Sequence, residues 1–265
     1  MIAIRFDIDT YHGLVDRTPA LLDVLDEFNV RATFFCVMGP EANAIDVLRL
    51  RFLKRGIRKG KLRAKRKGGP AYLVCAALFP KWVGARNPER LLEITRRGHE
   101  VQPHGWKHIQ WQRDLAGINV RHHLRKAVNA YRAVFGEPPM GFASPGRVYN
   151  RQTLEMMDEF GFAYAGDMDG DQPFRPEGCR HLQIPVTMFR TIDEMRDEGM
   201  SDDGIVDRFI HEIETRKDFC CFYEHPDNLF DSEFAILRRV YRYILDHGLP
   251  TVAHRDVVRR YSSGQ

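Results

Sequence analysis

The sequence predicts a single α/β domain in which parallel strands form a barrel-like sheet. Segments with the two-residue period of strands alternate with segments of helical period along the whole chain. A strand, a helix and a second strand follow one another before residue 40, which is the pattern of a βαβ unit. No Pro-, Ser- or Gly-rich linker divides the 265 residues, so we expect one domain over 1–265.

The expected elements follow from local patterns. In 19–30, apolar residues recur on one helical face, and a second helix opens at Asn87 and Pro88, the favoured N-cap and first-turn residues. The helix that follows Val120 is expected to stop at Gly136. The expected strands cover residues 1–9, 31–39, 99–105, 138–143, 162–170, 182–188, 219–225 and 251–254, and further helices cover 151–161, 202–215 and 231–247.

Residues 45–85 interrupt this alternation with a basic and apolar insertion. Between Arg49 and Lys67 there are eleven Lys or Arg residues and no acid. Because the chain has a net charge of +4 and this stretch contributes +11, the remaining residues carry −7. Leucines and Phe52 are interleaved with the cations, and Trp82 follows, so we predict that 45–82 contacts an anionic membrane surface. A solvated charged face and non-specific nucleic-acid binding are the alternatives; without a recognition motif, we expect no specific nucleic acid.

The cysteines and the N-terminus favour a reducing compartment. The five cysteines form no CxxC pair, so we expect buried small side chains and assign none to a metal; they are Cys36, Cys75, Cys179, Cys220 and Cys221. The first ten residues have the pattern of a strand and not of a signal peptide. We therefore expect a cytosolic protein.

Acids and histidines stand at the carboxyl ends of the predicted strands, where α/β barrels place reactive groups. Residues two apart share a strand face, so Asp7 and Asp9 would repel unless a cation lies near them. The set is Asp7 and Asp9, His104, Ser144 to Arg147, Asp167 with Asp169, and His225.

These residue types are suited to hydrolysis assisted by a metal. His104 and His108, four residues apart, can bind one ion together with a carboxylate if the chain turns there. Such a site leaves positions open for water and substrate. A second carboxylate can act as the general base, and His225 suits the general acid because its ordinary pKa is near 6.5.

The segments FDIDT, HGWKH, ASPGR, DMDGDQPFRP and FYEH, in this order, resemble the five motifs of the polysaccharide deacetylases, the NodB-homology domain of carbohydrate esterase family 4. The resemblance covers nearly the whole chain and implies a distorted (β/α) barrel. It implies Asp7 as the base, His225 as the acid, and one divalent metal on Asp9, His104 and His108. Zinc suits these ligands, and manganese, cobalt, nickel and iron are further choices.

Within this family, DIDTYHG, GHEVQPHGWKHIQWQ and DQPFRP followed by LQIPVTM resemble the bacterial deformylases of 4-deoxy-4-formamido-L-arabinose on undecaprenyl phosphate. The resemblance implies an N-acylated, lipid-linked amino sugar as substrate, on the route to lipid A modification. It also implies a location in the bacterial cytoplasm, peripheral on the cytoplasmic face of the inner membrane. A soluble deacetylase of N-acetylated oligosaccharide or cell-wall glycan, and a catalytically silent barrel that binds carbohydrate or membrane, are the alternatives.

Two positions depart from the family pattern. The third motif usually has an arginine directly after the strand phenylalanine, but here Ala143 follows Phe142. We expect Arg147 to reach Asp7 in its place and to hold that carboxylate ionised, the alternative being a surface arginine. The fourth motif lacks its usual tryptophan, and we expect Asp167 or Asp169 to orient Arg147 or His225.

Overall fold

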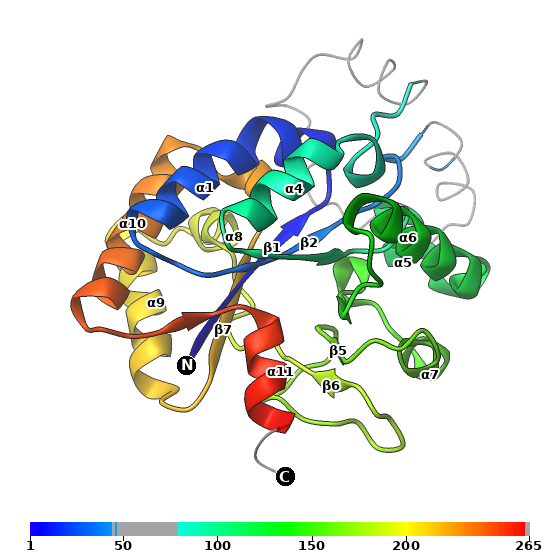
Figure 1. The fold of residues 1–265 in the computed structure, drawn as a ribbon. Helices are drawn as coiled ribbons and strands as arrows, with labels where there is room; N and C mark the ends of the chain where they lie inside the picture. Colours follow the sequence, from blue (N-terminus) through cyan, green and yellow to red (C-terminus); the bar gives the residue numbers. More distant parts are fainter. Residues whose placement is uncertain (44–45, 47–78, 263–265) are drawn as a thin grey trace.

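The strands form two parallel sheets. The computed structural model describes residues 1–43, 46 and 79–262 (Figure 1). In the described part of the chain, the first sheet has the order β3-β2-β1-β7, with β8 also paired to β1, and the second has the order β4-β5-β6. The strands are β1 (Ile2–Ile8), β2 (Thr33–Cys36), β3 (Glu100–Pro103), β4 (Gly141–Phe142), β5 (Tyr164–Ala165), β6 (Leu182–Gln183), β7 (Cys220–Glu224) and β8 (Thr251–Val252).

The two sheets meet edge to edge. On one side the amide of Ala143 donates to the carbonyl of Pro103 at 3.3 Å, which joins β4 to β3. On the other side the amides of Thr187 and Met188 donate to the carbonyl of Cys221 in β7 at 2.7 and 3.1 Å. The strands therefore close into an irregular ring, and the predicted distorted barrel is confirmed. Its strands β4, β5 and β6 are shorter than the sequence pattern predicted.

Helices surround this ring (Figure 1), with α1, α9 and α10 along one flank and α5, α6 and α7 along the other. The α-helices are α1 (Thr18–Glu27), α4 (Pro88–Arg96), α5 (His108–Asp114), α6 (Val120–Phe135), α7 (Arg151–Glu159), α8 (Ile192–Asp197), α9 (Asp202–Thr215), α10 (Asp231–Asp246) and α11 (His254–Ser262). The short helices are η1 (Gly13–Arg17), η3 (Gly84–Arg86), η4 (Leu115–Gly117), η5 (Pro145–Arg147) and η6 (Pro226–Asn228).

The helix boundaries follow the predicted signals. Proline is at the start of α4, and Asn87 precedes it, although the Asn87 side chain donates to the carbonyls of Trp82 and Val83 and does not cap the helix. Helix α6 begins after Asn119, whose side chain accepts from the His122 amide, and ends at Gly136 with φ 77°. Only glycine adopts that left-handed conformation without strain, so the predicted stop is confirmed.

Every residue of β1 is buried, because this strand lies at the centre of its sheet and is covered on both faces. The even-numbered residues, such as Ile4 and Phe6, belong to the main apolar core with α1 and α10. Ala3 belongs to a second apolar cluster with Phe35 and Tyr164 inside the ring. Arg5 and Asp7 share that inward face, so β1 carries two charged side chains into the ring interior.

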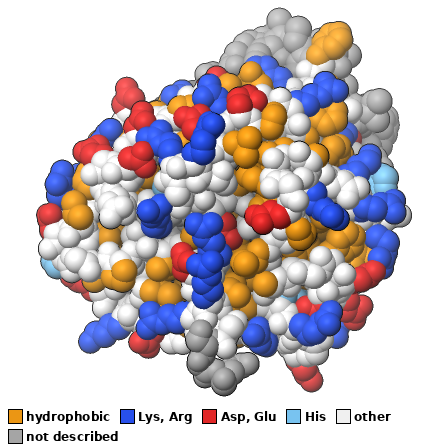
Figure 2. All heavy atoms as spheres, viewed as in Figure 1, with side chains coloured by type: hydrophobic (Ala, Val, Ile, Leu, Met, Phe, Trp, Pro, Cys, Tyr) orange, Lys and Arg blue, Asp and Glu red, His pale blue; other side chains and the backbone are white. Residues whose placement is uncertain are grey.

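The remaining features of the chain are the basic insertion, the cysteines and the surface of the protein. Most of the basic insertion, including Arg49 to Lys67, and Cys75 lie outside the described residues. Cys36, Cys220 and Cys221 are buried as predicted, whereas Cys179 is partly exposed. None of the described helices has the length and apolar character needed to span a bilayer. On the face seen in Figure 2, acidic and basic side chains are interspersed.

Candidate metal centre and catalytic residues

The carboxyl ends of β1 and β3 bring three predicted ligands together. Asp9 follows β1, His104 follows β3, and His108 is the first residue of α5. Between the histidines the chain turns at Gly105, which has φ 78° and lies against Pro145, where a Cβ would be only 3.0 Å from the proline ring. A glycine is required at this turn, which allows residues four apart to face the same point.

The ligand atoms converge. His104 Nε2 lies 3.5 Å from Asp9 Oδ1, and His108 Nε2 lies 3.2 Å from Asp9 Oδ2. One ligand atom from each of the three residues can be chosen so that all lie within 4.8 Å of one another. This is one carboxylate and two imidazoles at metal-binding separation, the set of three protein ligands that is typical of catalytic metal sites.

The chemistry of these donors fits a divalent cation. The Nδ1 atom of His104 donates to the carbonyl of Ala143 at 2.8 Å, so Nε2 keeps its lone pair toward Asp9. Burial lowers the pKa of His104 to about 3 and that of His108 to about 4, which keeps both rings neutral. Burial also raises the pKa of Asp9 to about 7, and its Oδ1 is buried with no hydrogen-bond partner in the described part of the chain. A bound cation would satisfy that oxygen.

Asp7 is paired with Arg5, a residue that the sequence analysis did not identify. The Nε and Nη2 atoms of Arg5 donate to Asp7 Oδ1 and Oδ2 at 2.7 and 2.8 Å, and Nη1 donates to the carbonyl of Gly166 at 2.6 Å. Burial by itself raises the pKa of Asp7, but the charge and hydrogen bonds of Arg5, together with contributions from His104 and His225, outweigh burial, so the carboxyl is held well below its usual pKa. Asp7 is therefore ionised, as a general base must be.

The position that we predicted for Arg147 is thus taken by Arg5. Arg147 follows β4 in η5, and its Nη1 donates to Asp169 at 3.0 Å, with the guanidinium 4.5 Å from the centre of the Phe189 ring. Arg5 reaches Asp7 because both residues are on the same face of β1, two apart. The signal was in the sequence: an arginine inside a buried strand needs an acidic partner.

The two aspartates of the fourth motif have different partners. Asp167 is buried and accepts from the amide and hydroxyl of Ser144 at 2.6 and 2.9 Å, so it braces the turn that follows β4. Asp169 has an exposed side chain and bonds Arg147. Of the pairings that we expected for them, the structure contains the one between Asp169 and Arg147.

His225 follows β7 and also lies near Asp9. Its Nε2 is 3.8 Å from Asp9 Oδ2, and about a quarter of its side chain is exposed. The ring of Tyr223 meets it edge-on with ring centres 5.4 Å apart. A histidine in this position, near the predicted ligand Asp9 and partly exposed to solvent, can deliver a proton to a leaving group.

One further contact at the site was missed. Thr10, directly after the ligand Asp9, donates its hydroxyl to Asp227 in η6. Gly13 makes this approach possible, since a Cβ there would be 2.9 Å from Asp227 Oδ2. The two partners are 217 residues apart in sequence, and no local pattern predicts their contact.

A second group of donor residues has a structural explanation. Asp158, Cys179 and His181 lie within metal-binding separation. However, His181 Nδ1 lies 2.8 Å from Asp158, which also accepts from the amides of Arg180 and His181 at 2.8 and 2.9 Å. These hydrogen bonds hold the turn before β6, and we propose no metal there.

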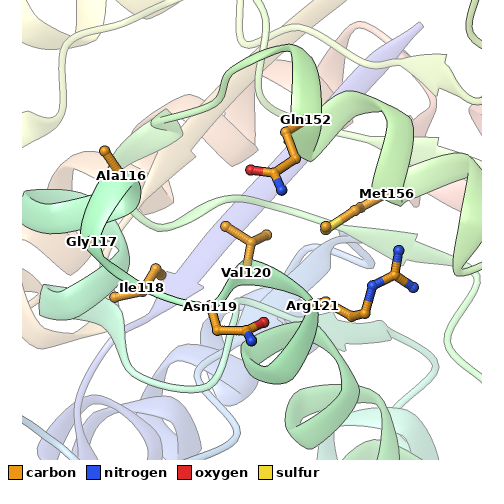
Figure 3. A pocket seen from close by; sticks show the side chains of 8 residues that line it. All are labelled: Ala116, Gly117, Ile118, Asn119, Val120, Arg121, Gln152 and Met156. Atoms are coloured by element: carbon orange, nitrogen blue, oxygen red, sulfur yellow. The ribbon is translucent and has the colours of Figure 1, made fainter.

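A surface pocket lies apart from the candidate metal centre (Figure 3). It is formed by residues 116–121 at the start of α6 together with Gln152 and Met156 of α7. None of the predicted ligands or catalytic residues lines it. We therefore do not place the reaction in this pocket.

Known proteins resemble this chain in sequence and in fold. A protein from Shewanella sediminis, named as a probable 4-deoxy-4-formamido-L-arabinose-phosphoundecaprenol deformylase, is 29% identical over 200 residues, which are 73% of this chain and 65% of the relative's length. The matched region therefore spans just under two thirds of that relative.

Solved structures share the fold. One from Pseudomonas aeruginosa PAO1, titled a probable polysaccharide deacetylase, matches with a TM-score of 0.67 and 18% identity, over 98% of this chain and 90% of that one. PuuE allantoinase matches with a TM-score of 0.66 and 18% identity, over 99% and 90%.

The family model described as polysaccharide deacetylase matches residues 1–165, the part that contains Asp7, Asp9 and the two predicted ligand histidines. This match covers more than half of the chain. The chain belongs to the polysaccharide deacetylase family.

Proposed function

We propose that the protein hydrolyses an N-acyl amide on an amino sugar, and that the acyl group is a formyl on a sugar carried by a polyprenyl phosphate. The observation that carries the proposal is the convergence of Asp9, His104 and His108 beside an ionised Asp7. The printed name of the Shewanella sediminis relative supports the formyl group and the lipid carrier.

Each residue of the candidate site has a separate role in the proposed reaction. Asp9, His104 and His108 would hold a divalent cation, which would supply a Lewis acid for the amide carbonyl and would acidify water. Asp7 accepts a proton from the attacking water, and Arg5 keeps it ionised and fixed in orientation for that task. His225 donates a proton to the departing sugar amine, whose nitrogen must leave as a neutral amine.

We also propose that the protein lies on the cytoplasmic face of the bacterial inner membrane. The support is the sequence of the stretch from Arg49 to Lys67, in which eleven cations occur without an acid. Each cation near an anionic surface contributes about 1 kcal/mol of attraction. A sugar attached to a membrane lipid would be within reach of a protein bound there.

The proposal is tested by release of formate from an N-formyl amino sugar linked to polyprenyl phosphate. We expect turnover by the wild type, loss of activity with a chelator, recovery on adding zinc, manganese or cobalt, and a fall in kcat of about 10²- to 10⁴-fold in Asp7→Asn. Undiminished turnover by Asp7→Asn would refute the assigned base. Asp16→Asn, on the surface near His12, is the matched control.

A second candidate is an N-acetyl glycan deacetylase, which the structural neighbour from Pseudomonas aeruginosa favours. The same assay decides between them. A kcat/KM on free N-acetylated oligosaccharides that equals or exceeds the value on the lipid-linked formamido sugar would favour the second candidate. Because family membership supports an amide hydrolase, we do not propose the catalytically silent barrel.

A further inference from the structure

Arg147 adopts a backbone conformation that arginine rarely takes. Its φ is 54°, in the left-handed region, where a residue other than glycine is strained. The turn is fixed on both sides, because Pro145 packs on Gly105 and a Cβ on Gly146 would lie 2.5 Å from Gln112. Strain of this kind is found preferentially at binding sites.

The Arg147 side chain is held by stacking and by a weak ion pair. Its guanidinium lies over the ring of Phe189, which is 39% exposed. The bonded partner is Asp169, whose side chain is 77% exposed. An exposed pair of this kind contributes little, and solvent can replace it, so the guanidinium remains available to another anion.

Arg147 lies at the same end of the ring as the predicted catalytic residues. Its turn begins at Ser144, next to the carbonyl of Ala143 that orients the ligand His104. Its stacking partner Phe189 directly follows Met188, which pairs with Phe222 of β7, the residue before Tyr223. Tyr223 in turn contacts His225.

Two other cations near the metal centre are engaged elsewhere. Arg5 is fully buried and bonds Asp7 with two of its nitrogens. Lys107, next to the ligand His108, donates to the buried carboxylate of Asp46 at 2.9 Å. Neither can meet a charged group of the substrate without leaving a buried acid unpaired.

We propose that Arg147, supported by Phe189, binds a phosphate ester on the sugar substrate and so selects glycosyl phosphates over neutral glycans. The inference rests on the proposed function and adds to it the residue that recognises the anionic group. The planar guanidinium can donate two parallel hydrogen bonds to phosphate oxygens, and Asp169, being exposed, can turn to solvent when the phosphate enters.

The test compares two substrates with the same N-formyl amino sugar, one as a short-chain prenyl phosphate and one as the methyl glycoside, without phospholipid. For Arg147→Ala we expect the KM for the prenyl phosphate to rise about tenfold or more while kcat and both constants for the methyl glycoside stay within about twofold. Arg147→Lys keeps the positive charge but cannot donate two parallel hydrogen bonds. Its KM for the prenyl phosphate should therefore lie between those of the wild type and Arg147→Ala. The control is Arg151→Ala, which replaces an exposed arginine four residues further along the chain. It should leave KM and kcat unchanged for both substrates.

A binding measurement separates this inference from the proposed function. Calorimetric titration with the deformylated sugar 1-phosphate should show weaker binding to Arg147→Ala than to the wild type, whether or not turnover occurs. Equal affinity, or equal losses on both substrates, would overturn the inference. A loss of sedimentation with vesicles of phosphatidylglycerol, with unchanged KM, would also overturn it, because the anion would then be a lipid headgroup. If the wild type shows no turnover but binds the sugar 1-phosphate more tightly than Arg147→Ala does, the proposed function is refuted and the anion site is not.

Discussion

Two arginine–aspartate pairs in this protein should contribute very differently to its stability. Arg5 and Asp7 approach to 2.7 Å, and Arg147 and Asp169 approach to 3.0 Å. In the first pair the side chains are 0% and 5% exposed, whereas in the second they are 29% and 77% exposed. The bond length is nearly the same, and burial sets the consequence of breaking the bond. A buried charge without its partner cannot recover its hydration, but an exposed charge can.

The largest expected effect is that of Arg5→Met. Removing one partner of a buried pair costs about 3–5 kcal/mol, because Asp7 would remain as an uncompensated charge inside the ring. We expect a loss of unfolding free energy of this size in urea denaturation. Arg5→Lys keeps a charge but not the two parallel bonds, so it should lose less. A loss below about 1 kcal/mol in Arg5→Met would show that the pair is more hydrated than its burial indicates.

Moving the arginine from position 5 to position 143 would test whether Asp7 needs a buried cation or Arg5 itself. Ala143 is fully buried beside Phe35 in the ring interior, and the family resemblance places an arginine at this position. We expect the double variant Arg5→Ala, Ala143→Arg to be more stable and more active than Arg5→Ala alone, because a cation is again available to Asp7. Urea denaturation and kcat measure the two effects. If the double variant is worse than Arg5→Ala in both, the space left by Arg5 does not accept a guanidinium from β4.

The same contrast between buried and exposed groups predicts acid sensitivity. His99 is 1% exposed, and burial lowers its pKa to about 4. Because the unfolded chain has the higher pKa, near 6.5, it binds the proton first, and stability is lost as the pH falls from 6.5 to 4. The loss from this residue reaches about 3 kcal/mol at the lower end.

His99→Leu should therefore flatten the decline of the urea midpoint between pH 6.5 and 4. The exposed His122 is the matched control, and His122→Leu should follow the wild-type curve. An unchanged slope in His99→Leu would mean that the folded protein accepts the proton on His99 by opening locally.

The sequence predicted the three residues that converge at the candidate metal centre, because each depends on a short segment. Asp9 follows from a strand end, and His104 and His108 follow from one glycine turn and the first residue of α5. Arg5 was not predicted as the partner of Asp7, because Ala143 stands where the family has an arginine and Arg147 is the next arginine along the chain. The i, i+2 relation of Arg5 and Asp7 predicts their contact only once β1 is known to be buried on both faces.

Other parts of the site depend on contacts that no local pattern encodes. The bond from Thr10 to Asp227 joins residues at opposite ends of the sequence, and closing the ring is what brings them together. Likewise Phe189 meets Arg147 because the segment after β6 pairs with β7. The β–α alternation predicted a barrel-like parallel sheet, but it did not predict the side-chain partners across the ring.

The smallest expected effect is that of Asp169→Asn. An exposed ion pair contributes about 0.2–1 kcal/mol, so the unfolding free energy should fall by no more than this, against about 3–5 kcal/mol for Arg5→Met. Raising the salt concentration should erase the difference between Asp169→Asn and the wild type, because salt screens exposed charges. Urea denaturation at low and high salt measures it. A loss above about 2 kcal/mol that persists at high salt would show that Asp169 holds the strained turn of Arg147 in place, and the contrast between the two pairs would then be one of degree.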